Sequence, residues 1–306
     1  MKPLTDSNIA SPHALVQEWL DSLETQGKSA STIKGYRRGM EHWTAWYEQS
    51  GGTPFDPAAV TPRDVRDWIA FQQTVERSQP ATINQRLAAA SSFYSWAVDQ
   101  ERVNRDPAAG VKALRLPARQ PRGLADTDLR RLRRCVHAGG NLRDVAIFEA
   151  LAGTGLRVSE ALTLSVADVL LDARPPHLVV RAGKGGQSRR VPLTAEVGRA
   201  LRDYLADLAR RGLSVKADAS LWLGQRGALR NPSTINKLLA GYADQVGVAD
   251  VTPHTLRHTF ATNYLDKHPG DVRGLAAILG HADLRTTMIY TEPDLATLAR
   301  RMEDVG

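Results

Sequence analysis

The chain has a single cysteine, Cys135, among its 306 residues. One thiol permits no disulfide within the chain and no zinc site built from several cysteines. The sequence also lacks an apolar run that approaches the roughly 18 residues of a membrane-spanning helix. Residues 1–11 do not have the basic and then apolar order of a secretory signal peptide. These absences exclude a disulfide scaffold and a membrane span, and they favour a cytoplasmic protein.

Internal repeats and low-complexity tracts are missing as well, and the glycine clusters do not form a nucleotide-binding motif. Neither the glycines at residues 153–155 nor those at residues 183–186 complete a dinucleotide fingerprint or a Walker loop. Nucleotide binding is therefore poorly supported.

The composition is that of an ordinary folded protein with a small positive charge. Apolar residues make up 42% of the chain and charged residues 24%, which argues against general disorder. The length suggests about two domains, since a domain has roughly 100–200 residues. A net charge of +7 and a pI near 9.7 permit an anionic partner such as DNA, but so small an excess does not identify one.

The first third of the sequence predicts four helices, because apolar residues recur there at helical spacing. The helices cover residues 11–27, 29–49, 61 onwards and 81–101. Thr61 followed by Pro62 is a typical helix start, and helices joined by short connections form a compact bundle. The periodicity lapses between residues 104 and 123, where prolines alternate with basic residues, so we expect a domain boundary there.

The expected organisation is a helical domain over residues 1–110, a basic linker over residues 111–123 and a second domain over residues 124–306. The linker is either a solvated strap or a strap along a phosphate backbone, and the two are compatible. In the second domain, helices are predicted over residues 125–137, 141–152, 157 onwards, 195–211, 233–246, 254–266, 271–279 and 294–304. Short β-branched runs at residues 166–171, 178–181 and 189–193 predict a small antiparallel sheet. The fold class is thus mainly α with a small antiparallel β-sheet.

Arg157 stands at the start of a predicted helix, after the glycines at residues 153 and 155. A helix N-terminus attracts anions through its free N–H groups and its dipole, and a guanidinium there adds a bidentate phosphate clamp. Glu160 is one turn further on and can hold the guanidinium by an i,i+3 contact. Taken alone, the two residues also fit an ordinary surface ion pair.

Lys184 lies in the predicted turn between two strands, flanked by glycines at residues 183, 185 and 186. Glycine permits the positive φ angles of a tight turn that lies close against a ligand. A lysine at a hairpin tip is usually only solvated, so this residue is informative only together with others.

His254 and Arg257 are one turn apart on a predicted helix that starts at Pro253, so they share a face. His254 and His258 also have the i,i+4 spacing of zinc ligands. The general-base glutamate of a zinc-protease helix is missing, however, and Arg257 would repel a cation from that face. A phosphate between His254 and Arg257 is the better electrostatic match, and His258 is a packing or supporting residue. No metal site is predicted.

The last group is His281, which follows Gly280, with Tyr290 nine positions further on. A tyrosine on a helix is far more often a core or interface residue than a nucleophile. The order of all these motifs is more informative than any one of them. Spread over more than 130 residues, they are Arg157-x-x-Glu160, Lys184, His254-x-x-Arg257, Gly280-His281 and Tyr290.

This ordered set resembles the tyrosine recombinase (integrase) family, most closely its Xer-type recombinases and its phage and transposon integrases. The stretches Leu256–Thr262 and Leu279–Thr287 also match the family's pattern. The stretch Ala173–His177 looks longer than usual between the first two strands, which should alter a loop and spare the active site. The resemblance implies a SAM-like helical core-binding domain followed by a mixed α/β catalytic domain.

The resemblance also implies a site-specific recombinase that cuts and rejoins DNA through a 3′-phosphotyrosyl intermediate. Tyr290 would be the nucleophile, Arg157, Arg257 and His281 would bind the phosphate, and Glu160 would support Arg157 or His254. His254 would exchange the tyrosine proton, and Lys184 would protonate the leaving 5′ oxygen. No cofactor, ATP or metal is implied.

The expected partner is double-stranded DNA with palindromic-type recombination sites. The candidate DNA contacts are Lys34, Arg37, Arg38, Arg86, Lys112, Arg115, Arg119 and Lys237. An apolar stripe over residues 294–304 suggests a terminal helix that docks in a neighbouring subunit of a homo- or hetero-tetramer, or else packs on its own domain.

Two other functions stay open at this point. A type IB topoisomerase uses similar chemistry but relaxes supercoils as a monomer, and a non-catalytic DNA-binding regulator could share the fold. The target DNA sequence is not predicted. Neither is the choice between chromosome-dimer resolution and mobile-element integration, nor the need for a partner protein.

Overall fold

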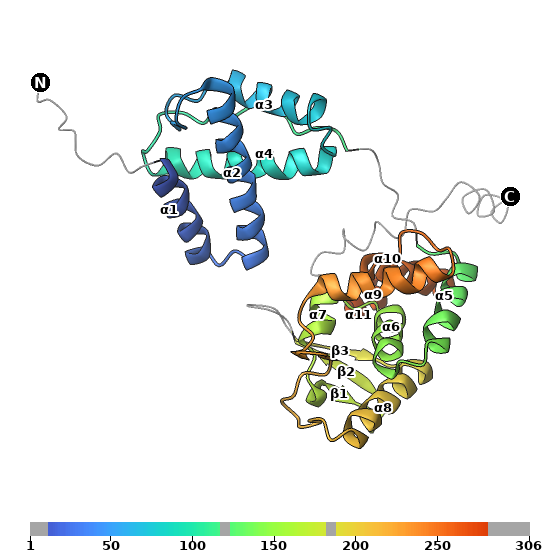
Figure 1. Cartoon of the computed structure of the whole chain (residues 1–306). Coiled ribbons are helices and arrows are strands. Elements are labelled where there is room, and N and C mark those ends of the chain that lie inside the picture. The colour runs from blue at the N-terminus through green and yellow to red at the C-terminus, as the bar shows by residue number, and fades with distance from the viewer. Residues whose placement is uncertain (1–11, 117–122, 182–187, 281–306) are drawn as a thin grey trace, which may run out of the picture. The chain divides into compact units, whose positions relative to one another are not determined.

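The computed structural model describes residues 12–116, 123–181 and 188–280. The chain divides into two compact units, Met1–Arg119 and Gln120–Gly306, each with its own hydrophobic core (Figure 1). Within the described ranges, no helix is long and apolar enough to cross a membrane.

The first unit is a bundle of helices that begin and end close to the predicted residues. They are α1 (Pro12–Thr25), α2 (Ala30–Gly51), α3 (Pro62–Thr74) and α4 (Pro80–Asp99). The start of α3 follows from its first residues, because the Thr61 side chain accepts from the Asp64 amide and the Asp64 carboxylate accepts from the Thr61 amide. This reciprocal capping box satisfies two donors that a helix start would otherwise leave free.

The core of the first unit forms where α2 crosses α4 (Figure 1). A Cβ added to Gly39 on α2 would lie 2.8 Å from the Cβ of Ala89 on α4, so only glycine permits this approach. Trp43 is fully buried nearby, with its ring centroid 4.8 Å from that of Trp68 and 5.5 Å from that of Trp46. Aromatic rings of this size bury much apolar surface in a small bundle.

The first residues of the predicted basic linker pack on the first unit. The Asn84 amide group on α4 donates to the Leu114 carbonyl oxygen at 2.9 Å, and its oxygen accepts from the Leu114 amide at 2.8 Å. Val111 and Leu114 also contact the apolar core. The chain is therefore held on this unit as far as Leu114.

The second unit surrounds α6 with the other helices and a sheet. Its helices are α5 (Asp126–Ala138), α6 (Leu142–Thr154), α7 (Val158–Thr163), α8 (Ala195–Arg210), α9 (Pro232–Gln245), α10 (Pro253–Lys267) and α11 (Val272–Leu279). α6 is buried almost all round, because α5, α8 and α10 pack against it (Figure 1). A helix that is buried on nearly every side occupies a core position, and the apolar residues of α6 form much of this core.

The antiparallel sheet has the order β1-β2-β3. Its strands are β1 (Val169–Leu170), β2 (His177–Val180) and β3 (Arg189–Pro192). Leu178 in the central strand pairs with Val169 on one side and Val191 on the other. The small sheet was predicted, but residues 166–168 form a 3-10 turn instead of the start of a strand.

A second, two-stranded sheet was not predicted. It consists of β4 (Leu223–Gly224) and β5 (Gly227–Ala228), which lie between α8 and α9. Trp222 anchors this hairpin, because its buried indole donates to the Ala161 carbonyl oxygen at 2.7 Å and stacks on Tyr204. Strands of two residues carry too little periodicity to be seen in a sequence.

The Asn84 contact predicts a difference in protease sensitivity. We expect Asn84→Ala to increase the rate of trypsin cleavage after Lys112 and Arg115 by about tenfold, because both hydrogen bonds to Leu114 are lost. Mass spectrometry of timed digests measures the rate at each site. Gln79→Ala, at an exposed position just before the same helix that makes no side-chain cap, is the control. Equal cleavage rates in the two variants would contradict this assignment.

Candidate active site

Three of the predicted site residues, Arg157, Glu160 and Arg257, lie together where α6, α7, α10 and α11 meet. Arg157 is the residue before α7, and α6 ends at Thr154 with Gly155 as its C-cap, at a φ of +64°. A Cβ on Gly155 would lie 2.6 Å from the Phe260 ring and 2.7 Å from a Leu279 methyl. Both the positive φ and the close packing require glycine, so this residue sets the direction in which Arg157 leaves the core.

Arg257 is almost completely buried on α10, with 4% of its surface exposed. Its Nη1 donates to the Gly155 carbonyl oxygen at 2.6 Å, and its Nη2 donates to the Leu279 carbonyl oxygen at 3.1 Å. The guanidinium thus joins the end of α6 to the end of α11. Carbonyl groups at a helix C-terminus carry negative partial charge, which stabilises a buried cation there.

Arg157 contacts the same helix end. Its Nη1 donates to the Glu160 Oε1 at 3.0 Å and to the Leu279 carbonyl oxygen at 3.3 Å. Arg157 and Arg257 therefore share one acceptor, and their guanidinium groups converge. The Arg157 side chain is 43% exposed, so it can contact a ligand as well as the protein.

Arg189 completes the cluster, and it was not predicted from the sequence motifs. It opens β3, and its Nη1 and Nη2 donate to the two carboxylate oxygens of Glu160, each at 2.9 Å. Arg189 and Val191 share one face of the strand, since side chains alternate along a strand. A charged residue in register with a core valine is a signal that could have identified Arg189, because buried charges need partners.

The carboxylate of Glu160 is ionised by its neighbours. Burial alone raises the pKa of Glu160, but hydrogen bonds from the Arg189 side chain and the Arg157 amide outweigh it, so its pKa lies below the ordinary 4.5. Oε2 accepts from the Arg157 amide at 2.8 Å, in addition to Arg189. Glu160 therefore contacts Arg157, one of its two predicted partners, through both side chain and backbone.

His254 and His258 differ in their surroundings. His254 is exposed in the first turn of α10, one turn before Arg257, while His258 is buried. Thr252 fixes the start of this helix, because its side chain accepts from the Thr255 amide. Within the described ranges, no group of three His, Cys, Asp or Glu residues could hold a metal ion.

Several predicted residues lie outside the described ranges. These are Arg119, Lys184, His281, Tyr290 and the predicted terminal helix over residues 294–304. The last described residue before His281 belongs to the cluster. It is Gly280, which has a φ of +66° and lies against Arg189.

Two family models match the chain. The model of the phage integrase family matches residues 124–296, and that of the N-terminal SAM-like domain of phage integrases matches residues 15–102. The chain belongs to the phage integrase family of tyrosine recombinases. This confirms the predicted family, and together with the structure it confirms the predicted fold class. The predicted domain boundaries at residues 110–111 and 123–124 stay predictions.

Among individual members of the family, Xer recombinases are similar along most of this chain. Tyrosine recombinase XerC of Neisseria gonorrhoeae is 33% identical, over 95% of this chain and 94% of the relative. Tyrosine recombinase XerD of Ralstonia nicotianae is also 33% identical, over 90% of this chain and 88% of the relative. The structure of XerH site-specific recombinase bound to palindromic difH substrate, a post-cleavage complex, has the same fold. Its TM-score is 0.73 at 20% identity, over 98% of this chain and 90% of that chain.

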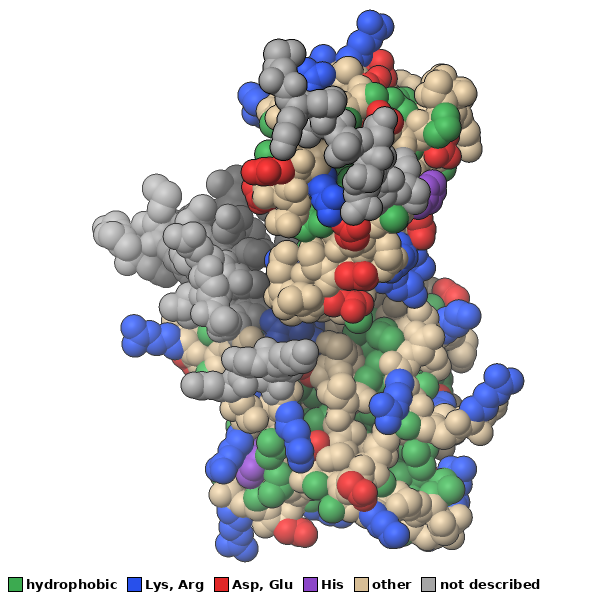
Figure 2. Space-filling view, turned by 90° about the vertical axis from the view of Figure 1, so that its left-hand side faces the viewer, with side chains coloured by type: hydrophobic (Ala, Val, Ile, Leu, Met, Phe, Trp, Pro, Cys, Tyr) green, Lys and Arg blue, Asp and Glu red, His purple; other side chains and the backbone are tan. Residues whose placement is uncertain are grey.

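The predicted DNA contacts of this family member differ in how free their side chains are. Lys34, Arg38, Lys112, Arg115 and Lys237 are exposed. Arg37 donates to Gln17, and Arg86 donates to Gln72 and to Glu76, so these two already have protein partners. On the face drawn in Figure 2, Lys and Arg side chains project from both units with Asp and Glu among them. Because charges of both signs are mixed on this face, surface charge alone does not indicate a DNA-binding area. The arginine cluster differs from the other basic residues in that its guanidinium groups converge.

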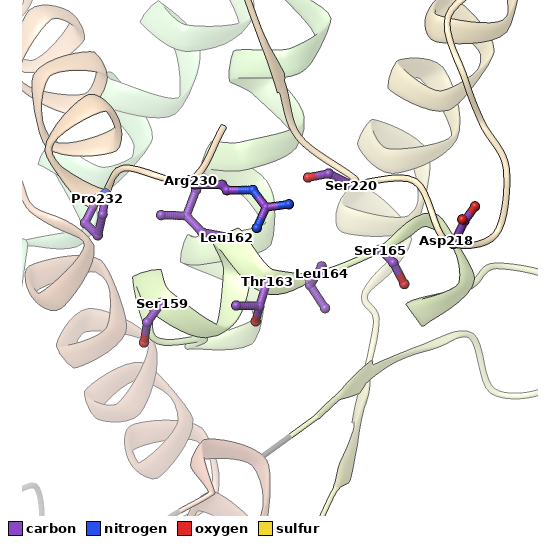
Figure 3. A pocket seen from close by; sticks show the side chains of 9 residues that line it. All are labelled: Ser159, Leu162, Thr163, Leu164, Ser165, Asp218, Ser220, Arg230 and Pro232. Carbon is purple, nitrogen blue, oxygen red and sulfur yellow. The ribbon is translucent and has the colours of Figure 1, made fainter. Parts of the chain in front are cut away.

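A pocket of about 360 Å³ opens along α7. Figure 3 shows Arg230, which precedes α9, reaching across this pocket toward Ser220. The residues that line the pocket are Ser159, Leu162, Thr163, Leu164, Ser165, Asp218, Ser220, Arg230 and Pro232. Arg230 carries no signal in the sequence, because a lone arginine before a helix has no distinctive spacing.

The lowered pKa of Glu160 predicts a pH-dependent stability. A carboxylate with a lowered folded pKa stabilises the fold above its ordinary pKa, and the contribution is lost as the pH falls through the folded value. We therefore expect Glu160→Gln to lower the free energy of unfolding at neutral pH, with a difference from wild type that shrinks below about pH 4.5. Urea titrations at stepped pH measure the difference.

The matched control is Glu41→Gln, which removes an exposed glutamate of the first unit. It should leave the free energy of unfolding near that of wild type at every pH. A Glu160→Gln difference that stays constant from neutral to acid pH would argue against the ion-pair role.

Proposed function

We propose that Tyr290, Arg157, Arg257, His254, Lys184 and His281 carry out the site-specific DNA cleavage and rejoining of this tyrosine recombinase. In this proposal Tyr290 attacks a DNA phosphodiester and forms a 3′-phosphotyrosyl intermediate, releasing a 5′-hydroxyl. The 5′-hydroxyl of another strand then attacks the phosphotyrosyl bond and releases the tyrosine. The observation that carries the proposal is the convergence of Arg157 and Arg257 on one carbonyl oxygen.

The chemistry explains why the tyrosine needs two fixed cations. A phenol with a pKa of about 10 is a weak nucleophile at neutral pH, and the phosphate under attack gathers negative charge. Guanidinium groups already in position stabilise that charge without reorganising during the reaction. Within the described ranges, Nε and Nη2 of Arg157 make no hydrogen bond, so they are available to non-bridging phosphate oxygens.

The remaining residues handle protons in this proposal. His254, which is exposed one turn before Arg257, takes the proton of the tyrosine hydroxyl. Lys184 protonates the departing 5′ oxygen, and His281 donates a further hydrogen bond to the phosphate. The covalent intermediate conserves the energy of the phosphodiester bond, so strand transfer needs no ATP. The arginines, the lysine and the histidines supply the positive charge that a metal ion supplies in other phosphoryl-transfer enzymes.

The expected substrate is double-stranded DNA with palindromic-type sites, and the expected role is Xer-like. The similarity to both XerC and XerD, and the common fold with XerH bound to palindromic difH substrate, support this assignment. We propose that strand exchange takes place in a homo- or hetero-tetramer, assembled on DNA through the helix predicted over residues 294–304.

The role of Tyr290 is tested with a nicked suicide substrate, on which the released fragment diffuses away and the adduct accumulates. Wild-type protein should form a covalent protein–DNA adduct that resists denaturing gel electrophoresis, and Tyr290→Phe should form none, because the nucleophilic oxygen is absent. Sites selected from random DNA, preferably palindromic ones, supply the substrate.

Tyr36→Phe, which alters a tyrosine stacked on Trp19 in the first unit, is the matched control and should retain the adduct. An adduct with Tyr290→Phe would reject the assignment. Supercoil relaxation of a plasmid without recombinant products would favour a topoisomerase.

The pocket along α7 predicts a further DNA contact. If Arg230 contacts a phosphate, Arg230→Ala should weaken binding to all sequences alike and reduce the slope of log K against log salt by about one. Lys237→Ala, on the adjoining helix, should have the same effect. Arg210→Ala makes the same charge change at an exposed arginine on α8 and should leave the slope unchanged. Fluorescence anisotropy over a salt series measures all slopes, and equal slopes for Arg230→Ala and Arg210→Ala would exclude the contact.

A further inference from the structure

Arg189 is the member of the arginine cluster to which the proposed mechanism gives no part. We infer that Arg189 is a positioning residue: it balances the charge of Glu160 so that Arg157 keeps its own charge for the phosphate, and it holds the end of α11 in register. This inference rests on the proposed function and adds to it the residue that sets the state of Arg157.

The hydrogen-bond geometry makes Arg189 the principal partner of Glu160. Arg189 places one nitrogen on each carboxylate oxygen, both at 2.9 Å, whereas the Arg157 side chain reaches only Oε1, at 3.0 Å. Two parallel hydrogen bonds between a guanidinium and a carboxylate form the stronger and more directional pair. The Glu160 carboxylate is therefore paired mainly with Arg189, and its contact with Arg157 serves mainly to orient the Arg157 side chain.

The charge balance follows from this geometry. Two guanidinium groups and one carboxylate leave one net positive charge, and the side chains of Arg189 and Glu160 are only 16% and 15% exposed. Water screens such a pair poorly. Without Arg189, Glu160 would face Arg157 alone, and the pair would be neutral. The guanidinium group of Arg157 could then turn toward the Glu160 carboxylate and away from a phosphate.

Arg189 also connects three elements mechanically. Its Nε donates to the Ile278 carbonyl oxygen at 2.8 Å, so it binds the end of α11 while it holds Glu160 on α7. A Cβ added to Gly280 would lie 2.6 Å from Nη1 and 2.7 Å from Cζ of Arg189. The backbone of Gly280 thus lies directly on the guanidinium. Arg189 thereby contacts the backbone at Gly280, the residue before His281.

A charge-restoration experiment separates this role from simple packing. We expect Arg189→Gln to slow single-turnover adduct formation on the suicide substrate by about 10- to 100-fold at saturating protein. The DNA dissociation constant should change far less than the rate. In the double variant Arg189→Gln with Glu160→Gln, the uncompensated carboxylate is gone, so the rate should recover above that of Arg189→Gln.

Other variants make the result decisive. Arg189→Lys keeps the charge without the fork, so its rate should lie between those of wild type and Arg189→Gln. Arg190→Gln changes the exposed neighbour on the opposite face of β3 and should cleave like wild type. Thermal unfolding by circular dichroism identifies any variant that does not fold. If Arg189→Gln does not fold, the comparison is made between Arg189→Met with and without Glu160→Gln, because this variant also removes the charge, and the same recovery is expected.

The outcomes separate the two proposals. A double variant no faster than its parent would mean that Arg189 acts only by packing, and this would overturn the inference. A wild-type rate in folded Arg189→Gln would overturn it too, while the proposed function would stand because wild type still forms an adduct through Tyr290. The absence of any adduct with wild type would instead overturn the proposed function and this inference with it.

Discussion

The structure of the site depends on how the carbonyl end of α11 is neutralised. Three arginines from three different elements, Arg157, Arg189 and Arg257, donate to the last carbonyl groups of this helix. The negative end of the helix thereby stabilises these cations. It offsets the free energy that their mutual repulsion and the loss of water around them would otherwise cost. In the proposed reaction the guanidinium groups are thus in position before DNA binds, which is the condition for electrostatic stabilisation of a transition state.

Glycines make this arrangement possible. Gly155 and Gly280 both have positive φ, and both have side chains of the cluster or its neighbours within a distance that a Cβ could not occupy. The polypeptide turns sharply at these two points, and Arg157 and Arg257 both donate to the Leu279 carbonyl oxygen at the end of α11. Backbone conformation, and not side-chain chemistry alone, therefore determines the geometry of the cluster.

The sequence was sufficient to predict the longer helices, the small three-stranded sheet and the family. Caps such as Thr61 and Thr252 and the recurrence of apolar residues mark helix ends locally. What it did not provide depends on contacts between distant residues. The hairpin at Trp222 has strands too short to show a period, the tie of Asn84 to Leu114 joins residues 30 positions apart, and Arg189 acquires its role only by facing Glu160.

The bonding of Glu160 also restricts the proton chemistry of the enzyme. Its two oxygens accept four hydrogen bonds, two each, from the Arg157 amide and the side chains of Arg157 and Arg189. A carboxylate with every lone-pair direction occupied and a lowered pKa neither takes up a proton at neutral pH nor has one to release. The only carboxylate in the described part of the cluster is thus an anion at neutral pH, and in the proposed mechanism proton transfer is left to His254 and Lys184.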